Sequence, residues 1–582
     1  MPKVWNIGNT TVRNPKRIEN ALKVFVEERF SGNAKGKQAE TRIHAKLKEK
    51  GVLEFDGKPS DWNGRKWRAA FYQLGFISYE KYKIGRDTFS PTDFFKQINE
   101  NNITLPYQLT EAGRKLILAT TVPQIEDIYL RQFACYEIPN SLERRFADGN
   151  LKPFILFVEV LKLLDDKHKG GLTKFETGLF IQKFRNHTSS LAKTILKEIL
   201  EYRAKISKCK TAKEAKKVNA VYLKDLAKFS GINPSSVVGD YADTTFRYFS
   251  LSGLFTRIGD SIVIRPNKKE FVNQLLKTEP VFLFKTKPLE YFRIFYTNTQ
   301  EIPTDNIKIA LNEISSLRSN IRDTANPLFK KVSTLTEKSN PETVQNVRYE
   351  LIEYNNWERE EEYAYEQQES KSVTEIIKYL KVLNNEKVEG NVIIDDKPAY
   401  LEWAVWRSFL SIDDITCRIH KTRRFPVDQD FLPRNTAPGG GSDLIFEFET
   451  YILVVEVTLT TSHRQMAVES EPVKRHTAQY KHLYPTKDVY CLFIAPNIDN
   501  NVVETFRIGT WYNADIEETV NVIPMSISDF IISIETLQKK KFHNSDFKIL
   551  LDNCLTYRNT SAPKWKATIK SEVESWCQKI NL

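Results

Sequence analysis

The chain has 582 residues, of which 41% are hydrophobic and 27% charged, so we expect three or four folded domains and not a disordered protein. A formal net charge of +12 and a pI near 9.0 favour a polyanionic partner. The six scattered cysteines form no CxxC pair, which argues against a disulfide framework and zinc ribbons and fits a reducing cytoplasm. We expect no signal peptide, membrane-spanning run or lipidation signal.

Residues 1–125 are predicted to contain helices followed by short strands. In chain order these are a helix after Arg13–Ile18, a helix over Lys37–Lys50, a helix ending at Gly75, strands at Tyr79–Ile84 and Phe89, and a helix start at Leu109–Gly113. Trp67 and Phe71 share one face of the third helix. The basic residues beside that face are Arg65, Lys66 and Arg68. This order is typical of a winged helix-turn-helix, so residues 1–125 are interpreted as a first DNA-recognition subdomain.

A similar order of elements recurs over residues 126–284. A helix is predicted at Tyr222–Phe229, a further turn at Ile232–Ser236, an aromatic helix at Thr244–Phe255, and two strands around Gly259-Asp260. The residues expected to reach DNA here are Thr244, Thr245, Arg247 and Arg257. We interpret this region as a second winged-helix-like DNA-recognition subdomain. The alternative for each copy is a small α/β scaffold whose basic residues are only solvated.

Two further segments have a distinct composition. A run of basic residues is expected to contact phosphates or, alternatively, to form a solvated linker: Arg203, Lys205, Lys208, Lys210, Lys213, Lys216 and Lys217. Residues 285–394 are predicted to be a helical linker with helices at Ile307–Asp323, Pro341–Asn355 and Val373–Leu383. The acidic segment Glu358–Glu362 within it is expected to form a solvated face.

Residues 395–582 are predicted to form an α/β domain, which makes the whole chain a multidomain α+β protein. The predicted elements are a helix over Ala399–Leu410, a strand near Cys417–Phe425, strands at Leu444–Phe448 and Ile452–Thr458, a helix over Arg464–Tyr484, and strands at Asp488–Ala495 and Thr519–Met525. This αβββαβ order is that of the PD-(D/E)xK nuclease core.

Two carboxylates fall on the paired strands that follow the Gly-rich loop Pro438–Gly441. Because side chains alternate along a strand, Asp443 lies on the face opposite Leu444, Phe446 and Phe448. Glu456 interrupts an otherwise apolar strand, where an ionised carboxylate is costly without compensation. Two convergent acids of this kind are typical of a Mg²⁺ site for phosphodiester cleavage. The alternative is that Glu456 pairs with a Lys or Arg and that Asp443 only caps the loop.

Several segments resemble the AlwI family of Type IIS restriction endonucleases, which includes site-specific nicking enzymes. They are the segments around Glu402, Ser442-Asp443, Val455–Thr458, Glu469–Val473 and Leu492–Pro496. The resemblance implies that the N-terminal half recognises a short asymmetric DNA site. It also implies that one C-terminal nuclease domain per chain cuts a few base pairs away. The matching active-site acids are Glu402, Asp443, Glu456 and Glu469.

This sequence departs from the general nuclease motif at two positions, where Ser442 replaces Pro and Thr458 replaces Lys. We expect Asp443 and Glu456 to bind Mg²⁺, with Mn²⁺ as a substitute, and Glu402 to assist the metal through water. Glu469 is expected to orient or deprotonate the attacking water. The alternatives for that task are Glu471, Lys474 and His476. Zinc is disfavoured, because the spacing of His463, His476 and His482 is irregular and no Cys accompanies them.

The resulting prediction is a Mg²⁺-dependent Type IIS endonuclease that acts on double-stranded DNA in a prokaryotic cytoplasm. It would nick one strand, or cut both through a transient homodimer of the nuclease domain or with a second small nuclease subunit. The alternative is a winged-helix DNA-binding regulator with an inert nuclease-like domain.

Overall fold

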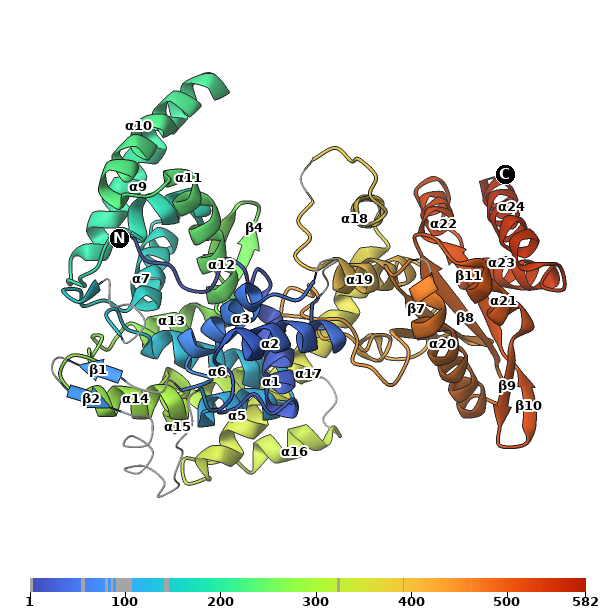
Figure 1. The fold of residues 1–582 in the computed structure, drawn as a ribbon, viewed down its shortest axis with the longest axis horizontal. Coiled ribbons are helices and arrows are strands. Elements are labelled where there is room, and N and C mark those ends of the chain that lie inside the picture. Colours follow the sequence, from blue (N-terminus) through green and yellow to red (C-terminus); the bar gives the residue numbers. More distant parts are fainter. Residues whose placement is uncertain are drawn as a thin grey trace. The chain divides into compact units, whose positions relative to one another are not determined.

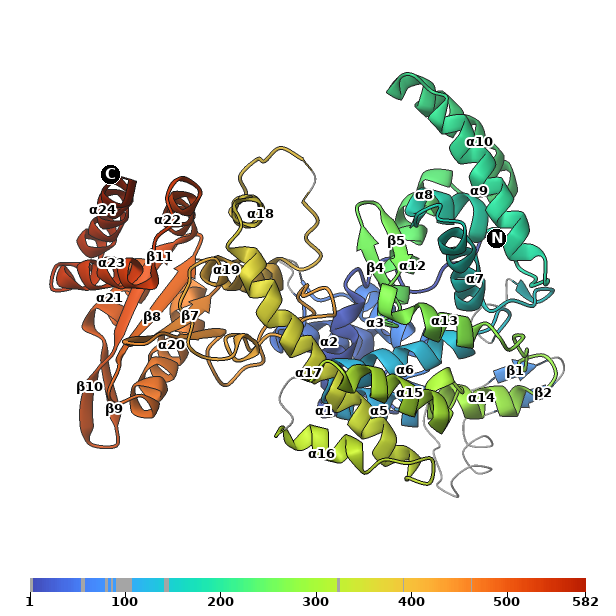
Figure 2. The ribbon, with the colours of Figure 1, turned by 180° about the vertical axis from the view of Figure 1, so that it is seen from behind.

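The computed structural model describes residues 4–53, 58–78, 82–84, 87–89, 107–140, 146–321, 325–390, 392–461 and 463–581 (Figures 1 and 2). The chain divides into two compact units, Met1–Glu353 (unit 1) and Tyr354–Leu582 (unit 2). Both are mixtures of helices and small sheets. Among the described residues, no helix has the length and apolar character needed to cross a bilayer.

Unit 1 is mostly helical. Its first elements are α1 (Ile18–Glu27), α2 (Lys37–Glu49), α3 (Asp61–Gln73), the paired strands β1 (Tyr82–Ile84) and β2 (Asp87–Phe89), α5 (Glu111–Leu118) and α6 (Val122–Cys135). The predicted helices of residues 1–125 are therefore confirmed. The second half of the predicted strand Tyr79–Ile84 is β1, whereas residues 79–81 and 90–106 lie outside the described residues. Helix α3 begins where the Ser60 side chain accepts the Asn63 N–H, and it ends before Gly75, whose φ of 74° favours glycine.

The second predicted reader contains its expected helices and hairpin, although the aromatic helix ends at Ser250 and Phe255 begins β4. The elements of this region are α7 (Pro153–Asp166), β3 (Leu172–Thr173), α8 (Lys174–Glu176), α9 (Leu191–Ser207), α10 (Ala212–Ser230), α11 (Pro234–Ser236), α12 (Ala242–Ser250), β4 (Phe255–Ile258), β5 (Ser261–Ile264) and α13 (Lys269–Leu275). The hairpin at Gly259-Asp260 is confirmed, with Ile258 paired to Ser261, and β3 adds a third strand in the order β3-β5-β4.

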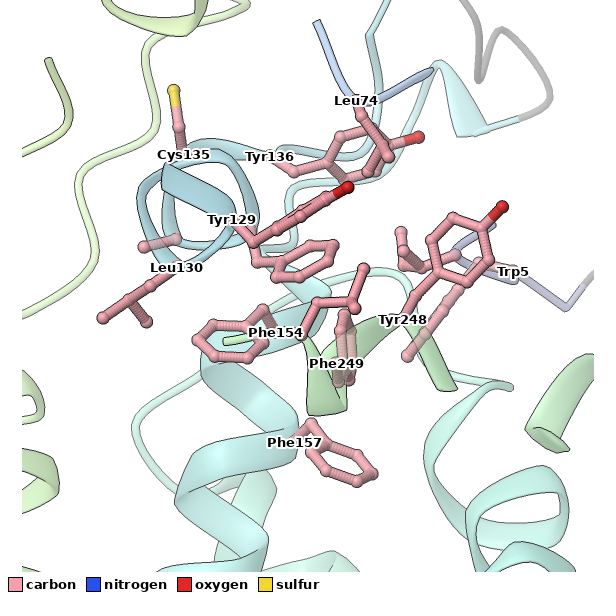
Figure 3. Packing of buried hydrophobic residues seen from close by; sticks show 14 of the residues in the cluster. Trp5, Leu74, Tyr129, Leu130, Cys135, Tyr136, Phe154, Phe157, Tyr248 and Phe249 are labelled. Carbon is pink, nitrogen blue, oxygen red and sulfur yellow. The ribbon is translucent and has the colours of Figure 1, made fainter. Parts of the chain in front are cut away.

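The two predicted readers share one hydrophobic core. Buried residues from Val4 to Ile302 form a single cluster, so the predicted boundaries at 125/126 and 284/285 fall inside it. Figure 3 shows Tyr129 of α6 and Phe154 of α7 beside Phe249 of α12. The rings of Phe154 and Phe249 lie edge to face with centroids 5.0 Å apart. Aromatic packing across the predicted boundary joins the two regions into one unit.

The predicted linker is divided between the two units. In unit 1 it supplies α14 (Pro288–Thr297), α15 (Ile307–Arg318), α16 (Pro327–Ser333) and the first half of α17 (Pro341–Gln367), and in unit 2 the rest of α17 and α18 (Ser370–Leu383). Arg348 of α17 is buried and forms ion pairs with Asp127 at 2.9 Å and Glu313 at 2.6 Å. These pairs fix the first half of α17 to α6 and α15.

The prediction that the acidic segment Glu358–Glu362 forms a solvated face is wrong for its central residue. Glu360 is 1% exposed and receives two hydrogen bonds from the Arg423 guanidinium, at 2.5 and 2.7 Å. Glu358 pairs with Arg418, and Glu361 accepts the backbone N–H of Ile419. These partners follow the acids by about 60 positions, so the local charge pattern did not reveal them.

Unit 2 is built on one four-stranded sheet. Its elements after α18 are α19 (Lys397–Leu410), β6 (Leu444–Glu447), β7 (Tyr451–Val457), α20 (His463–Leu483), β8 (Asp488–Ala495), α21 (Asn500–Ile508), β9 (Thr510–Asn513), β10 (Ile516–Thr519), β11 (Asn521–Ser526), α22 (Ile527–Lys539), α23 (Asn544–Thr556) and α24 (Ala562–Asn581). The strand order is β11-β8-β7-β6, in which β6 runs antiparallel to β7 and the other neighbours are parallel. Strands β9 and β10 form a separate hairpin.

Helices cover both faces of this sheet. Phe446 of β6 packs against Phe409 of α19, which also contacts Phe530 of α22 and Phe547 of α23. On the opposite face, Phe493 of β8 packs against Phe506 of α21. Because Phe493 is the register partner of Glu456, the Glu456 side chain lies on the second face.

The predicted strand near Cys417–Phe425 is wrong. The segment instead forms a short 3-10 helix (Ile419–Lys421) and a single antiparallel bridge between Arg423 and Leu444. The 3-10 helix occupies the residues before Arg423, so within the predicted strand only Arg423 forms a bridge to β6.

Glycine at position 64 is required by the close approach of α3 to α2. A Cβ there would overlap the backbone carbonyl of Glu40. We expect Gly64→Ala to destabilise unit 1 by about 1–3 kcal/mol through overpacking. Gly239, also helical, has nothing within 4 Å of its Cβ position, so Gly239→Ala is expected to be neutral or to stabilise by up to about 1 kcal/mol. Urea unfolding of both variants tests this, and equal effects would contradict the packing.

Candidate active site

Asp443 and Glu456 lie next to each other on one face of the sheet. The β6–β7 register pairs Leu444 with Val455, so the residues one step further, Asp443 and Glu456, also stand opposite each other. Asp443 Oδ2 accepts the backbone N–H of Val457 at 2.9 Å, which fixes its carboxylate at the end of β7. The predicted convergence of these two acids is present in the structure.

Helix α20 presents its polar side chains to this pair. Glu469 and His476 are seven positions apart and therefore share one helix face. His476 Nδ1 lies 2.7 Å from Glu456 Oε1. His476 is 5% exposed, and its Nε2 is buried without a hydrogen-bond partner among the described residues. Lys474 lies on another side of the helix, where its Nζ donates to the Thr510 carbonyl at 3.2 Å, so it does not join the acids.

Glu402 reaches the same region from α19. Its side chain is buried, and its Oε2 accepts the backbone N–H of Ala437, just before the Gly-rich loop, at 2.7 Å. Burial raises the pKa of Glu402 well above its ordinary value, and the charge of Asp443 raises it further. Glu402 is therefore a buried member of the site and not a solvent-facing acid of its helix.

The acids raise one another's pKa values. Burial and then the Glu456 charge raise the pKa of Asp443 well above its ordinary value. Burial and Glu469 raise the pKa of Glu456 from 4.5 to about 8, against the opposing charges of Arg424 and Arg475. Burial also raises the pKa of Glu469, although a hydrogen bond from the Thr458 side chain counteracts this. The four carboxylates thus form one electrostatically coupled cluster.

None of the four acids has a lysine or arginine nitrogen within 4.0 Å among the described residues. The alternative that Glu456 pairs with Lys or Arg is therefore wrong, since its partner is His476. Buried carboxylates without a cation are expensive. A divalent cation would relieve that cost, and a donor set of carboxylate oxygens suits Mg²⁺, which keeps several waters and needs only one or two carboxylates. Asp443 and Glu456 are the residues that fit such an ion.

A tighter group of potential ligands exists elsewhere in unit 2. Among the described residues, Asp413, Asp414 and His543 offer ligand atoms within 4.8 Å of one another. Asp414 and His543 are exposed, and the imidazole is already occupied by Asp413 at 2.9 Å. This group lies outside the coupled cluster and lacks its burial.

Most residues expected to read DNA are not free to do so. Arg68 is buried and ion-paired with Glu40, so its placement at a DNA surface is wrong. Thr244 and Thr245 are buried in α12, with hydroxyls engaged by the Asp240 carbonyl and the Gln182 amide. Arg247 donates to Asp243 at 2.7 Å and to the Arg13 carbonyl at 3.2 Å. The predicted apolar face of α3 is confirmed, since Trp67 and Phe71 are buried, but Arg68 is buried with it.

The remaining predicted contacts reach the surface. Arg65 is exposed, and both Arg65 and Lys66 lie over the ring of Trp62, which is 54% exposed. Arg257 lies on β4 of the predicted wing and is partly exposed. In the basic run, Arg203 is bound by Glu176 at 2.5 Å and is therefore structural.

Sequence reasoning missed Arg424. It lies between the short 3-10 helix and β6, and its positive charge lowers the pKa of Glu456 more than any other cation does. Arg424 was overlooked because the segment was read as an ordinary strand, and only the fold brings it beside the Gly-rich loop.

The model of the AlwI restriction endonuclease family matches residues 73–532. Because the match covers more than half of the chain, the chain belongs to the AlwI restriction endonuclease family. It is accordingly a restriction-type, site-specific deoxyribonuclease. No curated protein sequence matches the chain.

Two solved structures are similar to parts of the chain. One is the small subunit (R.BspD6I2) of the heterodimeric restriction endonuclease R.BspD6I, at 22% identity over 36% of this chain and 97% of that chain, with a TM-score of 0.26. The other is the BpuJ1 endonuclease binding domain in complex with pyrene- and phenanthrene-modified DNA, at 15% identity over 48% of this chain and 90% of that chain, with a TM-score of 0.27. TM-scores this low support no inference about this chain.

The raised pKa of Glu456 leads us to predict how the stability of the fold depends on pH. A carboxyl whose folded pKa is about 8 instead of 4.5 binds a proton more tightly in the folded state, so stability falls as pH rises from about 4.5 to 8. The loss approaches about 1.4 kcal/mol per pH unit in that window. Glu456→Gln removes this titration. Without metal, we expect the variant to unfold at a higher temperature than wild type at pH 8 and at a similar temperature at pH 5.

Mg²⁺ should raise the wild-type unfolding temperature at pH 8 more than that of the variant, because Gln carries no charge to compensate. Thermal unfolding followed by circular dichroism at both pH values measures the effect. The same pH dependence in both proteins would refute the coupled cluster.

Proposed function

We propose that the chain is a Mg²⁺-dependent Type IIS endonuclease that binds a short asymmetric DNA site through unit 1 and hydrolyses phosphodiester bonds with unit 2. The observation that carries this proposal is the cluster of four carboxylates, two buried and two partly buried, without a Lys or Arg partner among the described residues. Residual strand pairing at Arg423, followed by β6, β7, α20 and β8, supports a PD-(D/E)xK core with a reduced first strand.

In this proposal Asp443 and Glu456 hold Mg²⁺, and Mn²⁺ can replace it. When bound, the ion would polarise the scissile phosphate and lower the pKa of water. His476 orients Glu456 through its Nδ1, and its buried Nε2 has no hydrogen-bond partner among the described residues. Glu469 positions the attacking water or accepts its proton, and the Thr458 hydroxyl orients Glu469. Glu402 holds a further water and, through Ala437, the start of the Gly-rich loop.

Unit 1 supplies recognition in this proposal, through two winged-helix-like regions fused by a common core. The exposed position of Arg65 and the partly exposed positions of Lys66 and Arg257 support contacts with DNA phosphates or bases. One set of acids per chain would nick a single strand. Cutting both strands would need a second set, from a transient homodimer through unit 2 or from a separate small nuclease subunit. The family and the six free cysteines support a prokaryotic cytoplasmic location.

Removal of a site carboxylate should separate cleavage from binding. We expect Asp443→Ala and Glu456→Ala to lower the cleavage rate of supercoiled plasmid by at least about 10²-fold, since each removes charge at the reacting phosphate. Specific DNA affinity should remain within about threefold, because positioning contacts lie elsewhere. Plasmid assays with Mg²⁺ and run-off sequencing give rate, site and cut offset. Equal losses of binding and cleavage would contradict the division between the two units.

Arg65 and Arg68 provide a matched pair for locating the DNA surface. Arg65→Ala removes an exposed charge, so we expect weaker binding and a decrease of about 1 in the slope of log affinity against log salt. Arg68→Ala leaves Glu40 buried without its partner and should destabilise the chain by about 3 kcal/mol or more. DNA-binding titrations at several salt concentrations, combined with thermal unfolding, distinguish the two. If Arg65→Ala has the same slope of log affinity against log salt as wild type, the surface around Arg65 is not part of the DNA interface.

A further inference from the structure

Thr458 stands where the general nuclease motif has a lysine, so the site lacks its usual cation at that position. We propose that Arg424 takes the lysine's place and binds the scissile phosphate during cleavage. This inference rests on the proposed function. Arg424 lies outside the motif, and the segment before β6 places it next to Asp443.

The backbone fixes Arg424 beside the first site acid. Its N–H donates to the Asp443 carbonyl at 3.2 Å, so the two residues are cross-strand neighbours. Its Nη1 donates to the Ser442 carbonyl at 3.2 Å, which places the guanidinium along the Gly-rich loop. A Cβ at position 441 would overlap that guanidinium nitrogen, so Gly441 is what allows the close approach.

Arg424 differs from its neighbour Arg423 in its partners. Arg423 is locked to Glu360 by two charge-assisted hydrogen bonds. Among the described residues, no carboxylate oxygen lies within 4.0 Å of the Arg424 guanidinium. Most of its five N–H donors are therefore available to a ligand. A half-buried arginine next to Asp443, whose charge acts on Glu456 and whose guanidinium is held by carbonyl oxygen alone, is suited to an incoming anion.

The electrostatics agree with this placement. Burial raises the pKa of Glu456, and Arg424 opposes that shift. Burial lowers the pKa of His476, and Arg424 lowers it further. The charge of Arg424 therefore acts on His476 of α20 and on Glu456 of β7. Arg475 also acts on both groups, but it is bound to Glu471 at 3.0 Å.

The chemistry suits a guanidinium. During hydrolysis a bond forms between the water oxygen and phosphorus while the bond from phosphorus to the leaving sugar oxygen breaks. The water's proton passes to Glu469, and the leaving oxygen takes a proton from solvent. Negative charge grows on the non-bridging phosphate oxygens, and a forked guanidinium can hold two oxygens at once. It stays charged at every working pH, unlike a lysine amine in a buried site.

The test compares Arg424→Ala and Arg424→Lys with the control Arg475→Ala in single-turnover cleavage with Mg²⁺. We expect Arg424→Ala to slow cleavage by about 10²–10³-fold, as removal of one preorganised donor does elsewhere. Arg424→Lys should be intermediate, because an ammonium keeps the charge but loses the fork. Arg475→Ala, which removes a surface pair, should stay within about threefold. Added guanidinium ion should partly restore Arg424→Ala and not Asp443→Ala.

Gly441→Ala provides a second variant that keeps the arginine. We expect it to slow cleavage as well, because the added methyl group displaces the guanidinium. Thermal unfolding separates a direct role from a structural one. Arg423→Ala should unfold at a clearly lower temperature, because Glu360 then stays buried without a partner, whereas Arg424→Ala should unfold near wild type.

Wild-type cleavage rates in Arg424→Ala would overturn this inference, as would equal losses in Arg424→Ala and Arg475→Ala. Full activity of Gly441→Ala together with no guanidinium rescue would also overturn it, even if Arg424→Ala folds poorly. Failure of the wild-type chain to cut DNA with Mg²⁺ would instead contradict the proposed function itself. The two failures are thus distinguishable.

Discussion

Mutual repulsion among buried carboxylates is the constraint on which the arrangement of unit 2 depends. Asp443 and Glu456 face each other across β6 and β7, Glu469 approaches from α20, and Glu402 approaches from α19. Their raised pKa values show that the fold holds them together at an energetic cost. Aromatic packing of Phe409 against β6, α22 and α23 on the opposite face supplies the rigid support that such a cluster needs.

Unit 1 is held together in a different way, by one continuous hydrophobic core and by buried ion pairs. Its aromatic core runs through both predicted reader regions and includes Tyr129, Phe154 and Phe249 (Figure 3). Buried ion pairs then fix individual elements, as Arg68 does for α2 and α3 and Arg348 does for α17. Arginines that look like DNA contacts in the sequence are used here for assembly, and the exposed ones remain for a ligand.

Much of the site followed from the sequence, because strand alternation is a local property. The alternation placed Asp443 on the sheet face opposite to that of Phe446. The apolar run around Glu456 indicated a central strand whose carboxylate needed compensation. Glu469 came from the family resemblance. What the sequence could not reveal were partners distant along the chain, such as Glu360 for Arg423, Glu40 for Arg68, and His476 for Glu456. The predicted strand near Cys417–Phe425 is missing because a 3-10 helix at Ile419–Lys421 occupies its middle.

The central claim is that the carboxylate cluster binds a divalent ion beside DNA. It is tested most directly by electron paramagnetic resonance of Mn²⁺ added to the chain and a duplex whose backbone resists hydrolysis, in wild type and in the double variant Asp443→Asn/Glu456→Gln. The account predicts that wild type depletes the free Mn²⁺ signal stoichiometrically and that the double variant, equally well folded and DNA-bound, does not. The same depletion by both proteins would contradict it.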